Sequence, residues 1–237
     1  MEVEGMELAF EGVSVTRGSY DIRVSGSFCQ GINLVSGRVG SGKSTVAAMA
    51  AGILSPDGGS IHRKGISTSM LSFQFPESGL TGSTVKEEVY SYGVHDADTL
   101  AMADLSGRGE DDPLSLSRGE LKKLSLACVL SRPWDLLVLD GPFEALDCRG
   151  KREVCRWIEH RRSSIVILCT HEQHILPRID ALWEFQEHTL VFRGLVPEAL
   201  ARWDLAPTSI KTLISRGTLP FNVSEDDIRE AACRIQG

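Results

Sequence analysis

Short continuous runs of apolar residues divide the chain and predict buried strands. Residues 32–35, 136–139 and 165–168 are apolar at nearly every position, which is typical of parallel strands covered on both faces. Segments compatible with helices lie between them, at 45–51 and 149–161. Strands that alternate with helices in this way predict an α/β fold with a parallel sheet.

The rest of the chain is less regular. Residues 7–35 alternate apolar and polar positions between glycines, as short strands and turns do. Residues 69–75 predict one more strand, and residues 120–130 have helical spacing. The segment 76–118 is more polar, and its pattern predicts one helix near 85–92.

A glycine-rich segment connects the first buried run to the helix that follows it. It has the pattern of a phosphate-binding loop, a glycine and four residues before Gly-Lys-Ser, in the required place between a strand and a helix. We expect its backbone N–H groups to bind the phosphates of ATP, with Lys43 at the β- and γ-phosphates and Ser44 as a ligand of Mg²⁺. The residues predicted to bind nucleotide here are Gly37, Arg38, Val39, Gly40, Ser41, Gly42, Lys43, Ser44 and Thr45.

Two further patterns fit a nucleotide site. Asp140 ends the run at 136–139, and a carboxylate at the carboxyl end of a parallel strand beside such a loop is placed to hold Mg²⁺. Ser117 and Glu120 have the spacing of a capping box at a helix start. A capped helix start that contains a glycine, here Gly119, also presents N–H groups suited to a phosphate.

Together these patterns resemble the motifs of ABC-type ATPases, in the order that the family has them. Residues 115–120 are similar to the ABC signature and residues 73–77 to the Q-loop. Residues 144–147 are similar to the D-loop and residues 169–172 to the switch-histidine motif. With the phosphate-binding loop, the resemblance covers residues 8–175.

The resemblance implies a role for each matching residue. ABC ATPases work as dimers that hold two ATP molecules between their subunits, so Ser117 and Gly119 would contact the γ-phosphate bound by the partner's loop. Gln74 would contact Mg²⁺ or the attacking water and relay to a membrane subunit, and His171 would contact the γ-phosphate. The implied catalytic residues are Gln74, Asp140 and His171, and the implied metal ligands are Ser44, Gln74 and Asp140.

The subfamily that the chain resembles is that of the energy-coupling factor (ECF) importer ATPases. Residues 73–77 and 84–93 are similar to it, and so is the tail at 205–228. The surface around Gln74 would dock on a transmembrane subunit, with Glu87 and Glu88 on a solvated face beside it.

This resemblance implies a P-loop ABC ATPase fold with an N-terminal β subdomain, a short helical subdomain and a small C-terminal domain. We expect the ATPase domain at 1–200, with the helical subdomain at about 76–133, and a C-terminal dimerisation segment at 201–237. The segment 76–118 is shorter than the helical subdomain of the family, so we expect one of that subdomain's helices to be missing.

Three positions depart from the family's pattern. Gly141 stands where the family has a glutamate that acts as the catalytic base, and it carries no side chain. Glu144, three residues further along in the D-loop match, is not assumed to substitute for it. Arg118 replaces the first signature glycine. Arg17 stands where an aromatic residue stacks on adenine, so either Tyr20 or the guanidinium plane of Arg17 is expected to stack there.

Composition and charge bear on the size of the core, the kind of partner and the cellular location. With 237 residues, 42% of them hydrophobic, the chain suffices for one substantial core with a small appendage. A net charge of −7 argues against binding to nucleic acid or to an anionic membrane surface.

No apolar run approaches the roughly 18 residues that cross a bilayer, and residues 1–5 have no signal-peptide pattern. The six cysteines, without a C-x-x-C, predict reduced thiols and no zinc site. We therefore expect a cytoplasmic protein.

The leading interpretation is the ATP-binding and ATP-hydrolysing subunit of an ECF-type importer that takes up a vitamin or a transition-metal ion. The resemblance implies ATP and Mg²⁺ as cofactors, transmembrane subunits as partners, a homodimer or a heterodimer with a related ATPase, and a place on the inner face of the membrane. We expect its own catalytic site to be impaired, because of Gly141. The alternatives are a soluble ABC ATPase without a transport role and a nucleotide-dependent binding subunit that hydrolyses little ATP.

Overall fold

The computed structural model describes residues 5–18 and 20–236, so residues 1–4 of the acidic N-terminal segment lie outside it. Within this part of the chain, nine strands form one sheet in the order β4-β1-β2-β9-β8-β3-β7-β6-β5. The strands are β1 (Glu7–Arg17), β2 (Tyr20–Cys29), β3 (Gly31–Ser36), β4 (Gly58–Lys64), β5 (Ser69–Ser72), β6 (Leu136–Asp140), β7 (Ile165–Thr170), β8 (Ala181–Gln186) and β9 (Thr189–Leu195).

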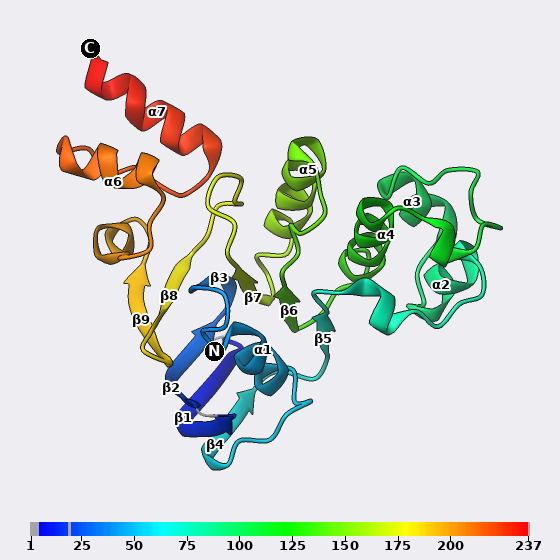
Figure 1. The fold of residues 1–237 in the computed structure, drawn as a ribbon, viewed down its shortest axis with the longest axis horizontal. Coiled ribbons are helices and arrows are strands. Elements are labelled where there is room, and N and C mark those ends of the chain that lie inside the picture. The colour runs from blue at the N-terminus through cyan, green and yellow to red at the C-terminus, as the bar shows by residue number, and fades with distance from the viewer. Residues whose placement is uncertain (1–4, 19, 237) are drawn as a thin grey trace.

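The helices lie around this sheet in separate groups (Figure 1). Helix α1 lies near the N-terminal strands, α2, α3 and α4 form a lobe beyond β5, α5 packs beside α4, and α6 and α7 lie at the opposite side, past β9. The helices are α1 (Lys43–Ala50), α2 (Val85–Ser91), α3 (Asp96–Met102), α4 (Arg118–Leu130), α5 (Cys148–Glu159), α6 (Thr208–Ser215) and α7 (Glu225–Gln236), with 3₁₀ turns η1 (Pro76–Gly79), η2 (Pro113–Ser115) and η3 (Glu198–Arg202). No helix among the described residues is long and apolar enough to span a membrane.

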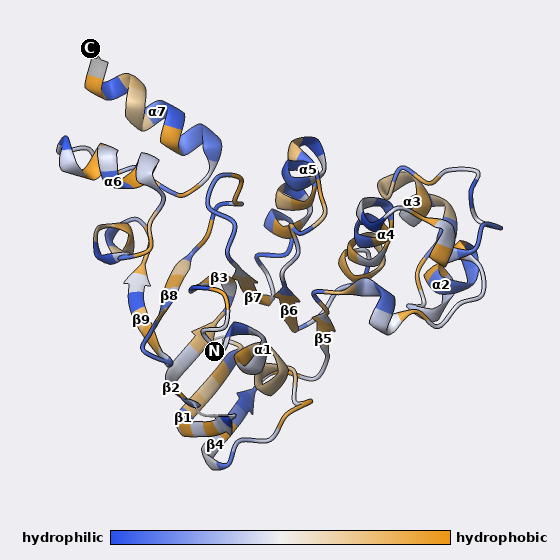
Figure 2. Cartoon of the chain, viewed as in Figure 1, coloured by the Kyte–Doolittle hydropathy of each residue, from blue (hydrophilic) through white to orange (hydrophobic). Residues whose placement is uncertain are grey.

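The three apolar runs form neighbouring parallel strands, as expected. β3 pairs with β7, and β7 pairs with β6. Every residue of β3 and β7 is buried, which explains why their sequences do not alternate. The register places Ser36 opposite Thr170 and Cys169 opposite Asp140, so the strands end together. Figure 2 shows these central strands as a hydrophobic zone of the molecule. One edge of the sheet thus collects the segments that follow β3, β6 and β7.

The helical lobe has a hydrophobic cluster of its own, with Val85, Val89, Leu100 and Leu124 among its buried members. Helix α2 agrees with the predicted segment, but α3 was not predicted from the sequence. Its seven residues contain two aspartates and one threonine and bury only Thr99 and Leu100, so its apolar face is too short to produce a helical pattern.

Glu88 corrects one expectation for this lobe. Glu87 is exposed, as predicted, but Glu88 is buried, with 3% of its surface accessible. Its carboxylate accepts hydrogen bonds from the backbone N–H groups of Thr81 and Gly82, both at 2.8 Å. A buried carboxylate that accepts such bonds holds the turn before α2 in place. Only Glu87 therefore belongs to a solvated face.

Strands β8 and β9 are the largest addition to the predicted elements. They form an antiparallel pair that lies between β2 and β3, so they join the N-terminal strands to the parallel core. Glu184 interrupts the apolar run of β8, yet it is fully buried. Nε of Arg193 donates to its carboxylate at 2.6 Å, and the N–H of Leu205 donates at 2.7 Å. The charge is thus paired inside the protein.

The C-terminal segment packs onto the core instead of standing apart. Nε1 of Trp203 donates to Oγ of Ser36 at 2.9 Å, directly before the phosphate-binding loop. Trp203, Ile210 and Val223 belong to the same hydrophobic cluster as Leu34 of β3. The guanidinium of Arg178 donates two hydrogen bonds, at 2.8 and 2.6 Å, to the fully buried carboxylate of Asp227 on α7.

Candidate functional site

The phosphate-binding loop connects β3 to α1. Lys43 is the first residue of α1, and its Nζ donates hydrogen bonds to the carbonyl oxygens of Gly37 and Arg38 at 2.8 and 2.9 Å. Gly42 precedes the helix with φ 112°, and a Cβ atom there would lie 2.7 Å from Cδ1 of Ile22. Glycine adopts this positive φ far more readily than other residues, which suits it to the turn into α1. An ammonium and a helix N-terminus meet at this loop, which suits a phosphate chain.

Two oxygen side chains beside the loop suit a magnesium ion. Ser44 lies in the first turn of α1 and Asp140 at the end of β6, and both line the same cavity. Burial raises the pKa of Asp140, and the nearby hydroxyl of Ser44 opposes the rise. Mg²⁺ prefers oxygen ligands, so the pair fits it. The buried hydroxyl of Ser41 has no hydrogen-bond partner among the described residues, so the loop keeps a polar atom free.

A cavity of about 260 Å³ joins the loop to the ends of three strands. Gln74 reaches it from the segment after β5, Asp140 from β6, and His171 from the segment after β7. These strands are parallel neighbours, which is why their carboxyl ends converge at one edge. The cavity is lined by Arg17, Tyr20, Ile22, Val39, Gly40, Gly42, Lys43, Ser44, Thr45, Gln74, Asp140, Gly141, Glu144, Cys169, Thr170, His171 and His188.

Gln74 binds a carboxylate inside this cavity. Its Nε2 donates to both carboxylate oxygens of Glu144, at 2.8 and 2.9 Å. Nδ1 of His171 lies 3.8 Å from Oε1 of Glu144. The structure thus brings Glu144 together with two predicted catalytic residues. The sequence analysis placed Glu144 in the D-loop match and did not assume that it substitutes for the missing glutamate, because nothing in a linear pattern shows that its side chain turns back toward Gln74.

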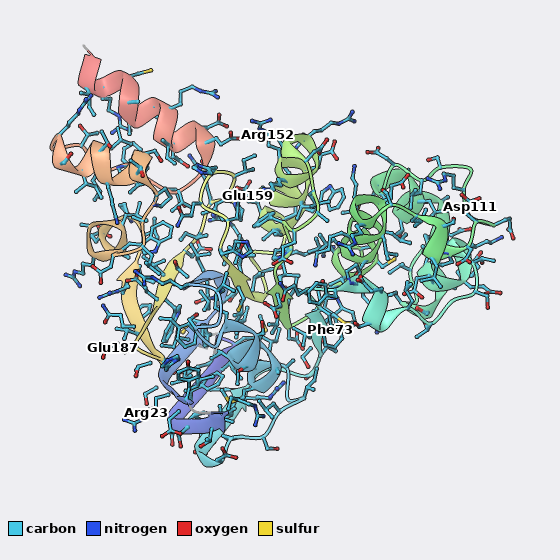
Figure 3. All side chains as sticks on the ribbon, viewed as in Figure 1. Arg23, Phe73, Asp111, Arg152, Glu159 and Glu187 are labelled. Carbon is cyan, nitrogen blue, oxygen red and sulfur yellow. The ribbon has the colours of Figure 1, made fainter. Side chains whose placement is uncertain are left out.

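Lys122 of α4 holds the segment that carries Gln74. Its Nζ donates to the carbonyl oxygens of Phe73 and Gln74 at 2.9 and 3.0 Å. Burial lowers the pKa of Lys122 to about 8, although the carboxylates of Glu144 and Asp140 oppose the shift. Figure 3 shows Phe73 where the sheet meets the helical lobe. The sequence analysis did not identify this lysine, because a lysine in a helical pattern is normally solvated.

The far end of the cavity contains both residues considered for adenine stacking. Arg17 and Tyr20 line it together with His188. The rings of Tyr20 and His188 are stacked, with centroids 4.2 Å apart. The backbone N–H of Arg23 donates to the carbonyl oxygen of His188 at 3.0 Å, which fixes the β8–β9 turn against β2. Figure 3 shows Arg23 and Glu187 at this end of the sheet. His188 was not predicted, because its turn is distant in sequence.

The signature residues lie outside the cavity of their own chain. Ser117 caps α4 in a capping box with Glu120, as the spacing predicted. Ser117 and Gly119 line a second cavity, of about 560 Å³, with Ala145 and Asp147. Gly119 lies against the D-loop, since a Cβ atom there would be 2.9 Å from the carbonyl oxygen of Ala145. Arg118 is exposed beside it.

The predicted loop residues divide between the two sides of the loop. Val39, Gly40, Gly42, Lys43, Ser44 and Thr45 line the cavity described above, whereas Gly37, Arg38 and Ser41 line neighbouring hollows. Of the other predicted site residues, Arg17, Gln74, Asp140 and His171 lie in the same cavity and Ser117 and Gly119 do not.

Comparisons with a family model and with a solved structure agree with an ABC ATPase fold. The family model of the ABC transporter matches residues 29–144. A solved structure described as a bacterial Atm1-family ABC exporter with ATP bound superimposes with a TM-score of 0.72 at 19% identity, over 85% of this chain and 41% of that chain. At this identity the likeness shows the fold, an ABC ATPase fold.

Similar sequences narrow the family. The energy-coupling factor transporter ATP-binding protein EcfA1 of Thermotoga maritima is 31% identical, over 83% of this chain and 85% of the relative. EcfA2 of the same organism is 28% identical, over 84% and 86%. EcfA2 of Streptococcus sanguinis is 32% identical, over 68% and 67%. The chain therefore belongs to the ABC transporter ATP-binding proteins, as an ATPase of the energy-coupling factor type.

Proposed function

We propose that the chain is the ATP-binding subunit of an ECF-type importer, bound to transmembrane subunits on the inner face of the cell membrane. The observation that carries this proposal is one cavity in which Lys43, Ser44, Asp140, Gln74 and His171 meet, in a chain similar to ECF transporter ATP-binding proteins over most of its length. The cavity fits Mg-ATP, with Ser44 and Asp140 near the metal and Lys43 at the phosphates.

The surface next to Gln74 is the proposed contact with the membrane subunit. Phe73 and Phe75 flank Gln74 and expose 47% and 58% of their surface. Large apolar side chains this exposed are typical of an interface. Because Lys122 binds the carbonyl oxygens of Phe73 and Gln74, a partner pressing on this segment would also move the signature helix α4.

Co-purification tests this proposal. The chain should isolate with an integral membrane protein when it is tagged in its native cell. Phe75→Ala should reduce the recovered partner at least about fivefold, because it removes an anchor at the centre of the contact. Two controls should have no effect: Ile53→Ala, which truncates an equally exposed apolar residue, and the charge reversal Glu87→Lys on the solvated face. If no membrane protein is ever recovered, the soluble ATPase is the better interpretation.

We propose a vitamin or a transition-metal ion as the transported substrate, because the ECF resemblance implies such cargo. The ATPases would work as a homodimer or with a related ATPase, and residues 201–237 would contribute to the pairing. Uptake of labelled candidate substrates by cells with and without Lys43→Ala tests the transport role. Unchanged uptake of every candidate would exclude it.

We also propose that hydrolysis at this chain's own site is slow. Gly141 provides no side chain where the family has its base, and a positioned base contributes about 10²–10⁴ in rate. Paired with a related ATPase, the chain would offer Ser117 and Gly119 to the partner's site. If hydrolysis were negligible, the chain would be a nucleotide-dependent binding subunit, and the absence of a side chain at Gly141 favours this alternative too. Turnover at the roughly 1–10 per second of an ordinary enzyme would exclude both slow and negligible hydrolysis.

A further inference from the structure

The space above Gly141 is filled by another residue's carboxylate. Gly141 has φ 56°, and a Cβ atom there would lie 2.8 Å from Oε1 and 3.1 Å from Cδ of Glu144. The same atom would lie 3.2 Å from Cγ of Gln74. A side chain at position 141 and the Glu144 carboxylate would therefore compete for one space. The missing side chain at 141 and the turned-in side chain at 144 are thus two parts of one arrangement.

The backbone directs Glu144 into this space. Phe143 is buried, with 2% of its surface accessible, and anchors the turn that follows β6. The N–H of Glu144 donates to the carbonyl oxygen of Gly141 at 3.4 Å, which closes the turn. Ala145 then adopts φ 60°, a conformation that turns the chain away. The position of Glu144 is therefore set by its neighbours on both sides.

The surroundings of Glu144 are those of a reacting group. Gln74 donates to both of its oxygens, and Nδ1 of His171 lies 3.8 Å from one of them. Its charge also acts on Lys43 and Asp140, the residues expected at the phosphates and the metal. The side chain keeps 26% of its surface accessible, so water reaches it.

From this geometry we infer that Glu144 is the general base for the slow ATP hydrolysis that remains at this chain's own site, in place of a residue at 141. The inference rests on the proposed ATPase function. The carboxylate takes a proton from a water molecule while the water oxygen bonds to the γ-phosphorus. The bond from the γ-phosphorus to the bridging oxygen breaks, and its electron pair leaves with ADP. The proton then passes to the phosphate product or to solvent. Gln74 positions the carboxylate.

Single-turnover hydrolysis of labelled Mg-ATP by the purified full-length chain tests the inference. Glu144→Gln keeps the size of the side chain and one oxygen that can accept from Gln74, but it cannot accept the proton. We expect it to hydrolyse ATP about 10²-fold more slowly or worse, while an ATP analogue binds within about threefold of wild type. Glu144→Asp should retain part of the rate. Glu110→Gln, on an exposed residue outside both cavities, should leave the rate unchanged.

Comparing binding with hydrolysis distinguishes a base from a structural residue. Glu144→Gln should bind the ATP analogue nearly as wild type does while hydrolysing ATP slowly, whereas loss of a structural residue should weaken both. A Glu144→Gln rate equal to wild type would overturn the inference and leave the importer proposal standing. The inference would also be overturned, with the importer proposal left standing, if the wild-type chain shows no ATP hydrolysis that is lost in Lys43→Ala. Failure to recover a membrane partner, with the Glu144 effect intact, would remove the transport proposal alone.

Discussion

Contacts between single residues link the D-loop to the signature. Gly119 faces the carbonyl oxygen of Ala145 at a distance that leaves no room for a Cβ atom. Ala145 has φ 60°, which glycine adopts more readily. Because Ala145 follows Glu144 directly, the proposed base and the signature lie on the two sides of one backbone contact. A methyl group added at Gly119 would therefore push on Ala145, and through it on Glu144 in the other cavity.

The adenine end of the cavity depends on one of two residues, and the structure favours Tyr20. Its ring is already stacked on His188, whereas the Nη1 atom of Arg17 donates to the neighbouring carbonyl oxygen of Thr16. We expect Tyr20→Ala to weaken ATP binding by about 1–3 kcal/mol, the usual value of stacking between an aromatic ring and a base. Titration with a fluorescent ATP analogue measures this loss.

Arg17→Ala is the matched control for this prediction. It removes the other candidate at the same cavity wall, and binding should change less than about twofold. If Arg17→Ala is the more damaging substitution, the guanidinium stacks on the base and the tyrosine only supports His188.

At the scale of elements, β8 and β9 are held by a buried ion pair. Glu184 is fully buried, and Arg193 exposes 15% of its side chain. We expect Arg193→Leu to lower the free energy of unfolding by about 3–5 kcal/mol, because it leaves a carboxylate buried without its cation. Urea denaturation measures the loss. The double variant Arg193→Leu/Glu184→Gln should recover a substantial part of it, since a neutral amide remains. No recovery would mean that packing of Arg193 matters and its charge does not.

Glu172 connects α5 to the segment after His171, and its ionisation makes the stability of the fold depend on pH. Burial tends to raise the pKa of Glu172, but the hydrogen bond from Lys151 and the N–H groups of His174 and Gln173 lower that pKa from 4.5 to about 2. The unfolded chain therefore takes up the proton first as the pH falls. The stability that Glu172 contributes is present above pH 4.5 and is lost as the pH falls toward 2.

Comparison with Glu172→Gln measures this contribution. The difference in the free energy of unfolding between wild type and variant should be largest near pH 7 and should shrink at pH 4 and pH 3, in urea titrations of both proteins. A difference that stays constant over this range would mean that the ionised form of Glu172 is not what stabilises the fold.

The sequence predicted the elements whose patterns are long or bound to a motif, and missed those that depend on distant partners. The three buried runs became β3, β6 and β7, because both faces of a parallel strand are covered. Strand β8 was missed because Glu184 interrupts it, and the partners that make a buried carboxylate tolerable there, Arg193 and the N–H of Leu205, lie outside the strand. Glu144 was missed as a site residue for a similar reason: its partner Gln74 lies 70 residues away.

At the scale of the whole molecule, the C-terminal segment is part of the core that supports the phosphate-binding loop. A chain ending at residue 206 keeps Trp203 on Ser36 and the N–H of Leu205 on Glu184, whereas a chain ending at residue 200 loses both. We expect the longer form to fold and bind ATP with a lower melting temperature than the full chain, because it lacks Ile210 and Val223 of the core cluster, and to lose self-association through the tail. The shorter form should aggregate or melt at least about 10 °C lower. Calorimetry and light scattering measure both properties. Equal melting temperatures would show that the segment 201–206 is dispensable for the fold.

The strand order also constrains how the chain reaches this fold during synthesis. β3 pairs with β7 on one side and β8 on the other, and β2 pairs with β9, so both partners of β3 and one partner of β2 come from the second half of the chain. A nascent chain that ends before residue 165 has an apolar β3 with both edges unpaired. Unpaired apolar edges are templates for aggregation, and pairing across so many residues is slow. We therefore expect the growing polypeptide to be prone to aggregation until residue 195 has emerged.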